Sequence, residues 1–374
     1  MKICIITSHY LPHIGGVELA TYNLANELIK FGHEVHIITP KFSNYNEIDD
    51  GGIILHRLFV PGYLSGKKWF SVLTAWLFMF KVIKCIKHIR PDVIHVQNIT
   101  NSIPSYIASC RYNIPYLICI NGNLELMGYF LPYFLKKYWP KLPYLKHANA
   151  IVTLTPEMVT EFTLDLKRDL VLIPTGVDIG KFSPIERTET SLLSNLILLT
   201  VCRLDDKKGI EYAIESMITI KSKFSNVKLL IVGDGEYRKY LEQLVIKWNL
   251  SKEVEFIGSV LNSEINQYYR KADVFLLPSL FEGYPLVLLE AMSCGLPIIS
   301  TPVSIAPEII NTWNNGYIVP FKSASAIADA VIAILSDRSK CKEFGINSFN
   351  ASKTVLTWRD VAKKYEQLYQ DIII

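Results

Sequence analysis

The stretch ADVFLLPSLFEGYPLVLLEAMSCGLPIIST, residues 272–301, shows the pattern on which the whole chain is built. An apolar run at 273–278 leads through a loop containing Gly283 and Pro285 into a helical segment, and a second apolar run follows at 296–300. Two such runs joined by a helix are typical of a parallel β-α-β unit. The stretch also has an unexpected feature, because Glu282 and Glu290 enclose seven residues that look like core, and buried acids need partners.

The same alternation of strand and helix continues along the chain and predicts an α/β fold with two doubly wound, Rossmann-like domains. In the first half, strands are expected at 2–7, 34–39, 52–57, 92–96, 115–120, 150–154 and 170–174. In the second half, they are expected at 196–202, 227–233, 254–258, 273–278 and 296–300. Helices are expected between most of them, for instance over 17–30, 69–89 and 156–164.

The domain boundary is expected where hydrophobic periodicity lapses, over residues 178–195. The expected division is a first domain over 1–182, a second domain over 183–353 and an amphipathic C-terminal helix within 354–374. With 374 residues, each domain is long enough to have a core of its own.

Composition narrows the class of protein. The formal charge of +4 is small for 374 residues, which argues against a dedicated nucleic-acid binder. The seven cysteines are odd in number and mostly lie in apolar runs, so we expect reduced thiols and a cytoplasmic protein. The N-terminus lacks the longer apolar core of a signal peptide, and the longest apolar run, 69–80, is too short to span a bilayer.

Functional residues are expected in the loops after strands, because open parallel sheets bind ligands beyond the carboxyl ends of their strands. Gly15 and Gly16 precede the first helix, where backbone N–H groups can meet a phosphate, although an ordinary turn has equal odds. Arg203 and Lys208 follow a strand and could straddle a diphosphate, although pairing with Asp205 and Asp206 in a solvated turn is the better reading of that loop alone.

Glu282 is predicted in a loop at the carboxyl edge of the sheet, and Pro285 suits the first position of the helix that follows. Glu290 is then about two helical turns further on, so the two carboxylates could flank one elongated ligand. Taken separately, Glu282 could be a loop acid favoured by the helix dipole, and Glu290 an exposed helix residue.

Taken together, these loops resemble those of the retaining glycosyltransferases of family 4, whose GT-B fold has two facing Rossmann-like domains and a C-terminal helix that returns to the first. The Glu-x7-Glu spacing is the most specific match. The matching features are the glycine pair 15–16, CRL-x3-KG (202–209), VGDGE (232–236), ADVFLLPS (272–279), EGYPLVLLEAMSCGLPIIST (282–301), PEII (307–310) and a terminal helix with a tryptophan.

The resemblance implies a role for each matching residue. Glu282 would hydrogen-bond hydroxyls of the donor sugar, and Glu290 would accept from the ribose hydroxyls of the nucleotide. Arg203 and Lys208 would neutralise the departing nucleoside diphosphate, and with Glu282 they form the expected catalytic set. Both carboxylates would be buried only when the donor's hydroxyls become their partners. The other expected donor-binding residues are Gly15, Gly16, Val260, Gly283, Tyr284, Pro285 and Leu286.

The implied reaction is transfer of a hexosyl or N-acetylhexosaminyl group from a nucleoside-diphosphate sugar, UDP favoured over GDP, to a glycan or lipid-linked glycan. The acceptor hydroxyl would attack the anomeric carbon on the same face from which the phosphate leaves, so that the anomeric configuration is retained. The resemblance implies no metal and no cofactor besides the sugar nucleotide, a role in cell-surface polysaccharide synthesis and no nucleic-acid partner. The first domain would bind the acceptor and the second the donor.

Two residues of the first half are expected near the sugar or acceptor. Asn121 stands where many relatives have histidine, and an amide can hydrogen-bond a hydroxyl but cannot take up a proton near neutral pH. His95, at the end of a strand, could face the ligand, although a structural histidine is the commoner case.

Aromatic and basic residues gather in two segments, 66–90 and 128–147, and suggest peripheral contact with an anionic membrane at the cytoplasmic face. The alternative is a core-facing helix with a solvated lysine face. Three other readings of the whole chain stay open: a catalytically silent GT-B protein that binds sugar nucleotides or glycans, a nucleotide-sugar epimerase, and, on the GxG at 233–235, a dinucleotide-dependent oxidoreductase.

Overall fold

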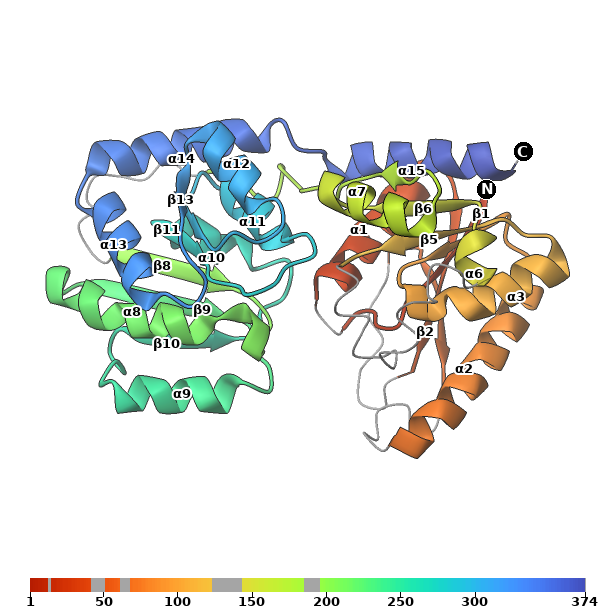
Figure 1. Ribbon diagram of the computed structural model, residues 1–374, viewed down its shortest axis with the longest axis horizontal. Helices are drawn as coiled ribbons and strands as arrows, with labels where there is room; N and C mark the ends of the chain where they lie inside the picture. The colour runs from red at the N-terminus through yellow and green to blue at the C-terminus, as the bar shows by residue number, and fades with distance from the viewer. Residues whose placement is uncertain (13–14, 42–50, 61–67, 123–142, 185–195, 374) are drawn as a thin grey trace. The chain divides into compact units, whose positions relative to one another are not determined.

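The chain divides into two compact units in a computed structural model, which describes residues 1–12, 15–41, 51–60, 68–122, 143–184 and 196–373. The first unit comprises Met1–Gly176 and Trp358–Ile374, and the second comprises Val177–Thr357. Each unit has its own parallel sheet with helices on it (Figure 1). The division thus falls at 176/177 and 357/358, a few residues from the positions that periodicity suggested, and residues 177–182 go with the second unit.

In the first unit, the described residues form a seven-stranded parallel sheet in the order β3-β2-β1-β4-β5-β6-β7. The strands are β1 (Lys2–Ile6), β2 (Glu34–Pro40), β3 (Ile54–Leu58), β4 (Val93–Val96), β5 (Tyr116–Ile120), β6 (Ala150–Thr153) and β7 (Val171–Leu172). The helices are α1 (Gly16–Lys30), α2 (Lys68–Ile89), η1 (Ile99–Asn101), α3 (Ser102–Tyr112), α6 (Pro143–Lys146), α7 (Pro156–Leu166) and α15 (Trp358–Ile373).

Helix α15 completes the first unit, although it comes last in the sequence. It packs alongside α1, and its buried face includes Trp358, Tyr365 and Tyr369. A hydrogen bond of 2.8 Å between the Nε2 of His33 and the Oε1 of Glu366 also links α15 to the segment after α1. The C-terminal helix is therefore part of the core of the first unit, because its regularly spaced aromatic residues pack into that core.

In the second unit, the described residues form a six-stranded parallel sheet in the order β10-β9-β8-β11-β12-β13. The strands are β8 (Leu196–Val201), β9 (Val227–Val232), β10 (Val254–Gly258), β11 (Val274–Leu277), β12 (Ile298–Ser300) and β13 (Gly316–Ile318). The helices are η4 (Asp206–Lys208), α8 (Ile210–Lys223), α9 (Arg238–Lys247), α10 (Asn266–Lys271), α11 (Leu286–Ser293), α12 (Ala306–Trp313), α13 (Ala324–Leu335) and α14 (Arg338–Ser352).

Successive residues of the second sheet face opposite sides, so its strands are buried on both faces. Leu198 and Leu229 belong to one core cluster, with residues of α8, α9 and α13, and these helices gather together in Figure 1. Leu199 and Leu230 belong to the other cluster, with residues of α10, α11 and α12. The near-continuous apolar strands of the sequence are explained by this double covering.

The predicted fold class is confirmed, since both units are parallel α/β sheets. All twelve expected strands are present, with ends that differ by up to two residues; the short strand β13 was not predicted. Helix α10 begins at Asn266, so Asn262 and Ser263 lie in the turn before it and are not its N-cap. Asn262 instead accepts a hydrogen bond from Lys181, at 2.7 Å.

Candidate active site

The strand order of the second unit reverses between β8 and β11, which lie side by side although the chain places β9 and β10 between them. The loops that leave the carboxyl ends of these two strands start out together and diverge, and such a switch point is where doubly wound sheets bind ligands. The two loops are 202–209 and 278–285, so the strand order brings together the predicted Arg203, Lys208 and Glu282.

Arg203 is held loosely in the loop after β8. Its Nε and Nη2 atoms donate to the Oδ2 of Asp205 at 3.1 and 3.0 Å, and 60% of the side chain is exposed. Asp205 also caps the short helix η4 by accepting from the backbone N–H of Lys207. An exposed ion pair of this kind contributes at most about 1 kcal/mol. The guanidinium can therefore exchange Asp205 for an incoming anion at little cost.

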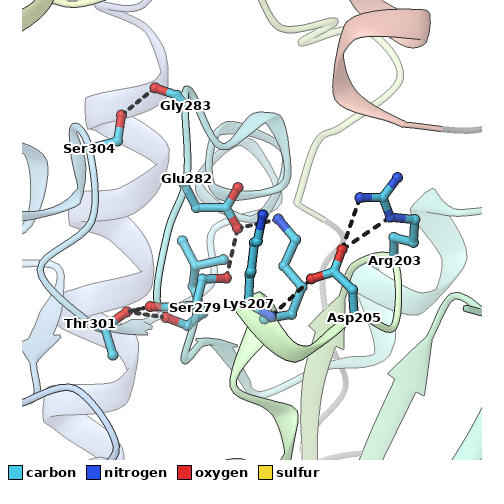
Figure 2. A network of polar contacts seen from close by, with 10 residues as sticks. Arg203, Asp205, Lys207, Ser279, Glu282, Gly283, Thr301 and Ser304 are labelled. Atoms are coloured by element: carbon cyan, nitrogen blue, oxygen red, sulfur yellow. Dashed lines mark hydrogen bonds and ion pairs between the residues drawn. The ribbon is translucent and has the colours of Figure 1, made fainter. Parts of the chain in front are cut away.

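Lys208 and Glu282 form an ion pair between the two loops, at 2.8 Å from the Nζ to the Oε1 atom. Ser279 donates its hydroxyl to the same Oε1, at 2.7 Å. Figure 2 shows the second oxygen of Glu282 directed away from Ser279. Glu282 is thus oriented through one oxygen, and the other faces away from the protein groups that hold it.

The loop that carries Glu282 is fixed by the segment that follows β12. The hydroxyl of Thr301 donates to the carbonyls of Leu277 and Ser279, at 3.2 and 2.5 Å. Ser304 donates its hydroxyl to the carbonyl of Gly283, at 2.8 Å (Figure 2). Ser304 adopts a left-handed backbone conformation, with φ of 47°, to make this contact. The segment after β12 therefore sets the path of the loop on both sides of the carboxylate.

Glycine is required where the loop after β8 meets its neighbours. Gly209 has φ of +60°, and a Cβ atom there would lie 2.2 Å from the carbonyl oxygen of Pro278. Gly233 has φ of +130°, and a Cβ atom there would lie 1.8 Å from the carbonyl oxygen of Cys202. The Gly-Asp-Gly turn after β9 therefore supports the Arg203 loop by close packing.

Glu290 is the fifth residue of α11 and is buried, with 9% of its surface exposed. Its Oε2 accepts a hydrogen bond from the hydroxyl of Tyr269, at 2.7 Å. Burial raises the pKa of Glu290, while the Tyr269 hydrogen bond and the charge of Lys181 lower it. Glu290 is therefore not the exposed helix residue that the sequence allowed.

The expectation that both carboxylates are buried only in the presence of a donor is wrong. Each already has protein partners: Ser279 and Lys208 for Glu282, and Tyr269 for Glu290. Since the partners of an ionised carboxylate offset its desolvation, the fold can hold both acids in place before any ligand arrives.

Other predicted donor-site residues lie around the same loops. Pro285 and Leu286 are buried at the start of α11, and Pro285 is the N-cap residue, one position earlier than predicted. Tyr284 and Val260 are partly buried against the core cluster that includes α11, and burial raises the pKa of Tyr284 to about 12. These positions shape the walls of the loop, and their roles toward a donor stay predictions.

The glycine pair of the first unit lies at the N-terminus of α1, Gly15 as N-cap and Gly16 as the first helical residue. A Cβ atom on Gly16 would meet nothing within 4 Å, so space is open at that position. A Cβ atom on Gly15 would instead lie 2.4 Å from the Oε2 of Glu18. Open backbone at a helix N-terminus is compatible with the predicted phosphate contact.

Asn121 has its carboxamide held from both ends. Its Nδ2 donates to the backbone and side-chain oxygens of Gln97, at 2.5 and 2.9 Å, and its Oδ1 accepts from the thiol of Cys119. The residue remains partly exposed, so contact with a ligand stays a prediction.

His95 is fully buried in β4, where its Nδ1 lies 2.7 Å from the hydroxyl of Tyr369 and its ring packs on Tyr365. Burial lowers its pKa to about 3, so it is neutral near neutral pH. This placement argues against the predicted sugar or acceptor contact and for a structural histidine between β4 and α15.

Sequence reasoning missed four residues that hold the two glutamates or the loop of Glu282: Ser279, Thr301, Ser304 and Tyr269. Ser279 has a weak local signal, because it lies three residues before Glu282 in a loop. Thr301 ends the motif 282–301, but nothing local indicates that its hydroxyl reaches back to the loop. Ser304 and Tyr269 lie outside the quoted motifs. Among the described residues, no three histidine, cysteine, aspartate or glutamate side chains gather in a way that could hold a metal ion.

The chain matches two family models that together cover most of its length. Residues 14–181 match "Glycosyltransferase Family 4", and residues 185–351 match "Glycosyl transferases group 1". One relative, the alpha-monoglucosyldiacylglycerol synthase of Acholeplasma laidlawii, is 26% identical over 100% of this chain and 98% of its own.

Solved structures agree on the fold. Sucrose-phosphate synthase from Thermosynechococcus elongatus has a TM-score of 0.84 at 22% identity, covering 99% of this chain and 98% of that one. HepE from Anabaena, in complex with UDP and glucose, has a TM-score of 0.81 at 18% identity, covering 99% and 100%. The two parallel α/β units are thus those of a GT-B glycosyltransferase, and the chain belongs to the family 4, group 1 glycosyltransferases.

Proposed function

We propose that this glycosyltransferase moves a hexosyl or N-acetylhexosaminyl group, with retention, from a UDP-sugar to a glycan or lipid-linked glycan in cell-surface polysaccharide synthesis. The observation that carries the proposal is the oriented Glu282, paired with Lys208 at the β8/β11 switch point. The UDP preference over GDP is supported by HepE, whose structure contains UDP and glucose. A lipid-linked acceptor is supported by the name of the Acholeplasma relative, a synthase of a glucosyldiacylglycerol.

Each cation and carboxylate then has a defined task. Arg203 leaves Asp205 for the diphosphate, and Lys208 adds a second positive charge beside it, where negative charge develops as the bond breaks. The free oxygen of Glu282 accepts from a sugar hydroxyl, and Glu290 accepts from the ribose. Backbone groups of residues 283–286 lie along the sugar and phosphates, Val260 borders the base, and Gly15 and Gly16 offer open backbone to a phosphate.

The reaction breaks the bond between the anomeric carbon and the leaving phosphate oxygen, which keeps the bonding electrons. The acceptor oxygen forms the new bond on the same face and passes its proton to the departing phosphate, so the anomeric configuration is retained. We propose that the two cations of the loop after β8 suffice for this charge and that no metal is needed. Activity that survives EDTA supports this point, and activity that returns only with added Mg²⁺ or Mn²⁺ contradicts it.

Donor choice is tested by measuring thermal shifts with UDP, UDP-glucose, UDP-N-acetylglucosamine and GDP-mannose. We expect a uridine donor to raise the melting temperature of the wild type, and Glu290→Gln to weaken that shift. Stabilisation by GDP-mannose alone would contradict the uridine preference. Release of free UDP also distinguishes a transferase from a catalytically silent binding protein. A transferase releases UDP as it transfers the sugar to an acceptor or to water, whereas a silent protein releases none.

Helix α2 supports peripheral contact with an anionic membrane at the cytoplasmic face. Its outer face exposes Trp76 and Phe80, at 55% and 61%, with Leu77 between them and Phe59 close to Lys81. The exposed lysines that follow on the same helix are Lys81, Lys84 and Lys87. An apolar patch continuous with cations suits an interface with anionic headgroups. The second predicted membrane segment, 128–147, falls mostly outside the described residues, and no described helix is long and apolar enough to cross a bilayer.

Sedimentation with vesicles tests this surface. Vesicles with one-third phosphatidylglycerol should retain the wild type more strongly than neutral vesicles, and the double variant Trp76→Ser, Phe80→Ser should lose that retention. Leu164→Ser is the control, because Leu164 is an exposed apolar residue, at 74%, on a different helix, α7. Equal retention of both variants would contradict the assignment of this face.

A further inference from the structure

Residues 181–183, just inside the second unit, are fastened to helix α10. The guanidinium of Arg270 donates to the carbonyls of Lys181 and Ser183, at 3.3 and 3.2 Å. The ring of Phe182 meets that of Tyr269 edge to face, with centroids 5.6 Å apart. The backbone from which the Lys181 side chain projects is therefore fixed by the same helix that supplies the hydroxyl partner of Glu290.

The Lys181 side chain is half-buried. Its ammonium lies 4.7 Å from the centre of the Phe182 ring and donates to the Oδ1 of Asn262, at 2.7 Å. Asn262 comes two residues after Val260, in the turn that follows β10. Lys181 thus lies between the turn proposed to border the base and helix α10, whose Tyr269 donates to Glu290.

The charges of Lys181 and Glu290 act on each other. Burial raises the pKa of Glu290 and Lys181 lowers it; burial lowers the pKa of Lys181 and Glu290, with Asp178, raises it. The other titratable groups beside Glu290 are uncharged at neutral pH, since burial raises the pKa of Tyr269 well above its usual value and that of Cys294 to about 12. Lys181 is a cation whose charge lowers the pKa of this carboxylate, and Arg270 also faces the cluster, where its charge lowers the pKa of Cys294.

We propose that Lys181 is a positioning residue of the donor site, whose ammonium keeps the buried Glu290 ionised so that the carboxylate can accept the ribose hydroxyls. This inference rests on the proposed role of Glu290. An ionised carboxylate only accepts hydrogen bonds, whereas a protonated one presents an O–H that competes with the ribose donors. Tyr269 already donates to the Oε2 of Glu290, so the Oε1 is the atom whose protonation would change how the ribose binds.

The test compares the wild type with Lys181→Met, which keeps the apolar stem over Phe182, and Lys181→Arg, which restores the charge. UDP affinity is measured by calorimetry from about pH 6 to pH 9, each variant relative to the wild type at the same pH, so that titration of UDP itself cancels. We expect Lys181→Met to bind UDP more weakly than the wild type at the low end, by up to about tenfold for each unit by which loss of the charge raises the pKa of Glu290, and to approach the wild type at the high end. Lys181→Arg should follow the wild type throughout.

A loss that is the same at every pH would indicate a merely structural lysine and overturn the proposal. The second readout needs no nucleotide: the carboxyl ¹³C resonance of Glu290, assigned with Glu290→Gln, should titrate at higher pH in Lys181→Met than in the wild type. An unchanged titration overturns the coupling even if UDP binds normally. A shifted titration in a protein that binds neither UDP nor GDP instead refutes the donor site itself, and with it the proposed function.

Discussion

The Nζ atom of Lys208 lies 2.8 Å from the Oε1 atom of Glu282, and this ion pair joins the loops that leave β8 and β11. Both side chains are largely buried, so each charge depends on the other for compensation. The pair sets the distance between the cation proposed for the phosphates and the acid proposed for the sugar. Variants that disturb either residue, or the contacts that orient them, therefore test the account.

Glu282→Gln should lower kcat about 100-fold or more, because the amide cannot carry the charge that fixes Lys208 and accepts from the sugar. The matched control is Glu264→Gln, an acid of the same unit in the turn before α10, which should behave as the wild type. Steady-state kinetics with the preferred donor measures both. Full activity in Glu282→Gln would remove this residue from the catalytic set.

Ser279→Ala should have a smaller effect than Glu282→Gln, about tenfold in kcat/KM. The variant loses one of the two hydrogen bonds to Oε1 but leaves the charge and Lys208 in place, and a single hydrogen bond contributes about 0.5–1.5 kcal/mol. Combining both substitutions should add little to Glu282→Gln alone, because Ser279 acts through that carboxylate. Additive losses in this double-mutant cycle would mean that Ser279 has a separate role.

Alanine at Gly209 and at Gly16 should give opposite results. Gly209→Ala should destabilise the second unit by several kcal/mol, since its Cβ would overlap the carbonyl of Pro278 at a positive φ. Gly16→Ala should leave stability unchanged or slightly higher, because alanine favours the helix and the space is open.

If Gly16 approaches a phosphate as predicted, the same variant should raise the KM for the donor; an unaltered KM would exclude that contact. Urea unfolding and kinetics measure the two effects.

His95 should make the first unit less stable in mild acid. Burial lowers its pKa from 6.5 to about 3, so between these values the unfolded chain binds a proton that the folded chain does not. Stability should then fall as pH drops below 6.5, by about 2 kcal/mol between pH 7.5 and pH 5. His95→Gln should flatten that slope in urea unfolding, whereas His147→Gln, at an exposed position, should not. An equally steep slope without His95 would contradict this assignment.

The fold and the main loops could be predicted from sequence because each depends on local patterns. Apolar runs of four to seven residues separated by amphipathic helices specify parallel strands, and a motif such as Glu-x7-Glu keeps its spacing in any structure. The burial of Glu290 could not be predicted, because the hydroxyl that receives it comes from Tyr269, 21 residues earlier on another helix. The Lys181–Asn262 contact spans 81 residues for the same reason.

His95 shows the opposite limit of sequence reasoning. A histidine at the carboxyl end of a strand has the right position for a ligand, and only the return of α15 reveals that Tyr365 and Tyr369 cover it. Asn121, two residues after Cys119, remains accessible, because its amide is held by Gln97 and leaves part of the side chain exposed.

The anomeric configuration of the first-formed product tests the central claim most directly. The donor that stabilises the wild type is supplied as its α-linked UDP-sugar, with water or a glycan as acceptor, and the anomeric proton of the product is followed by ¹H NMR before mutarotation. The account predicts an α-product together with one equivalent of UDP, both abolished in Glu282→Gln. A β-product, or turnover that continues in that variant, would contradict it.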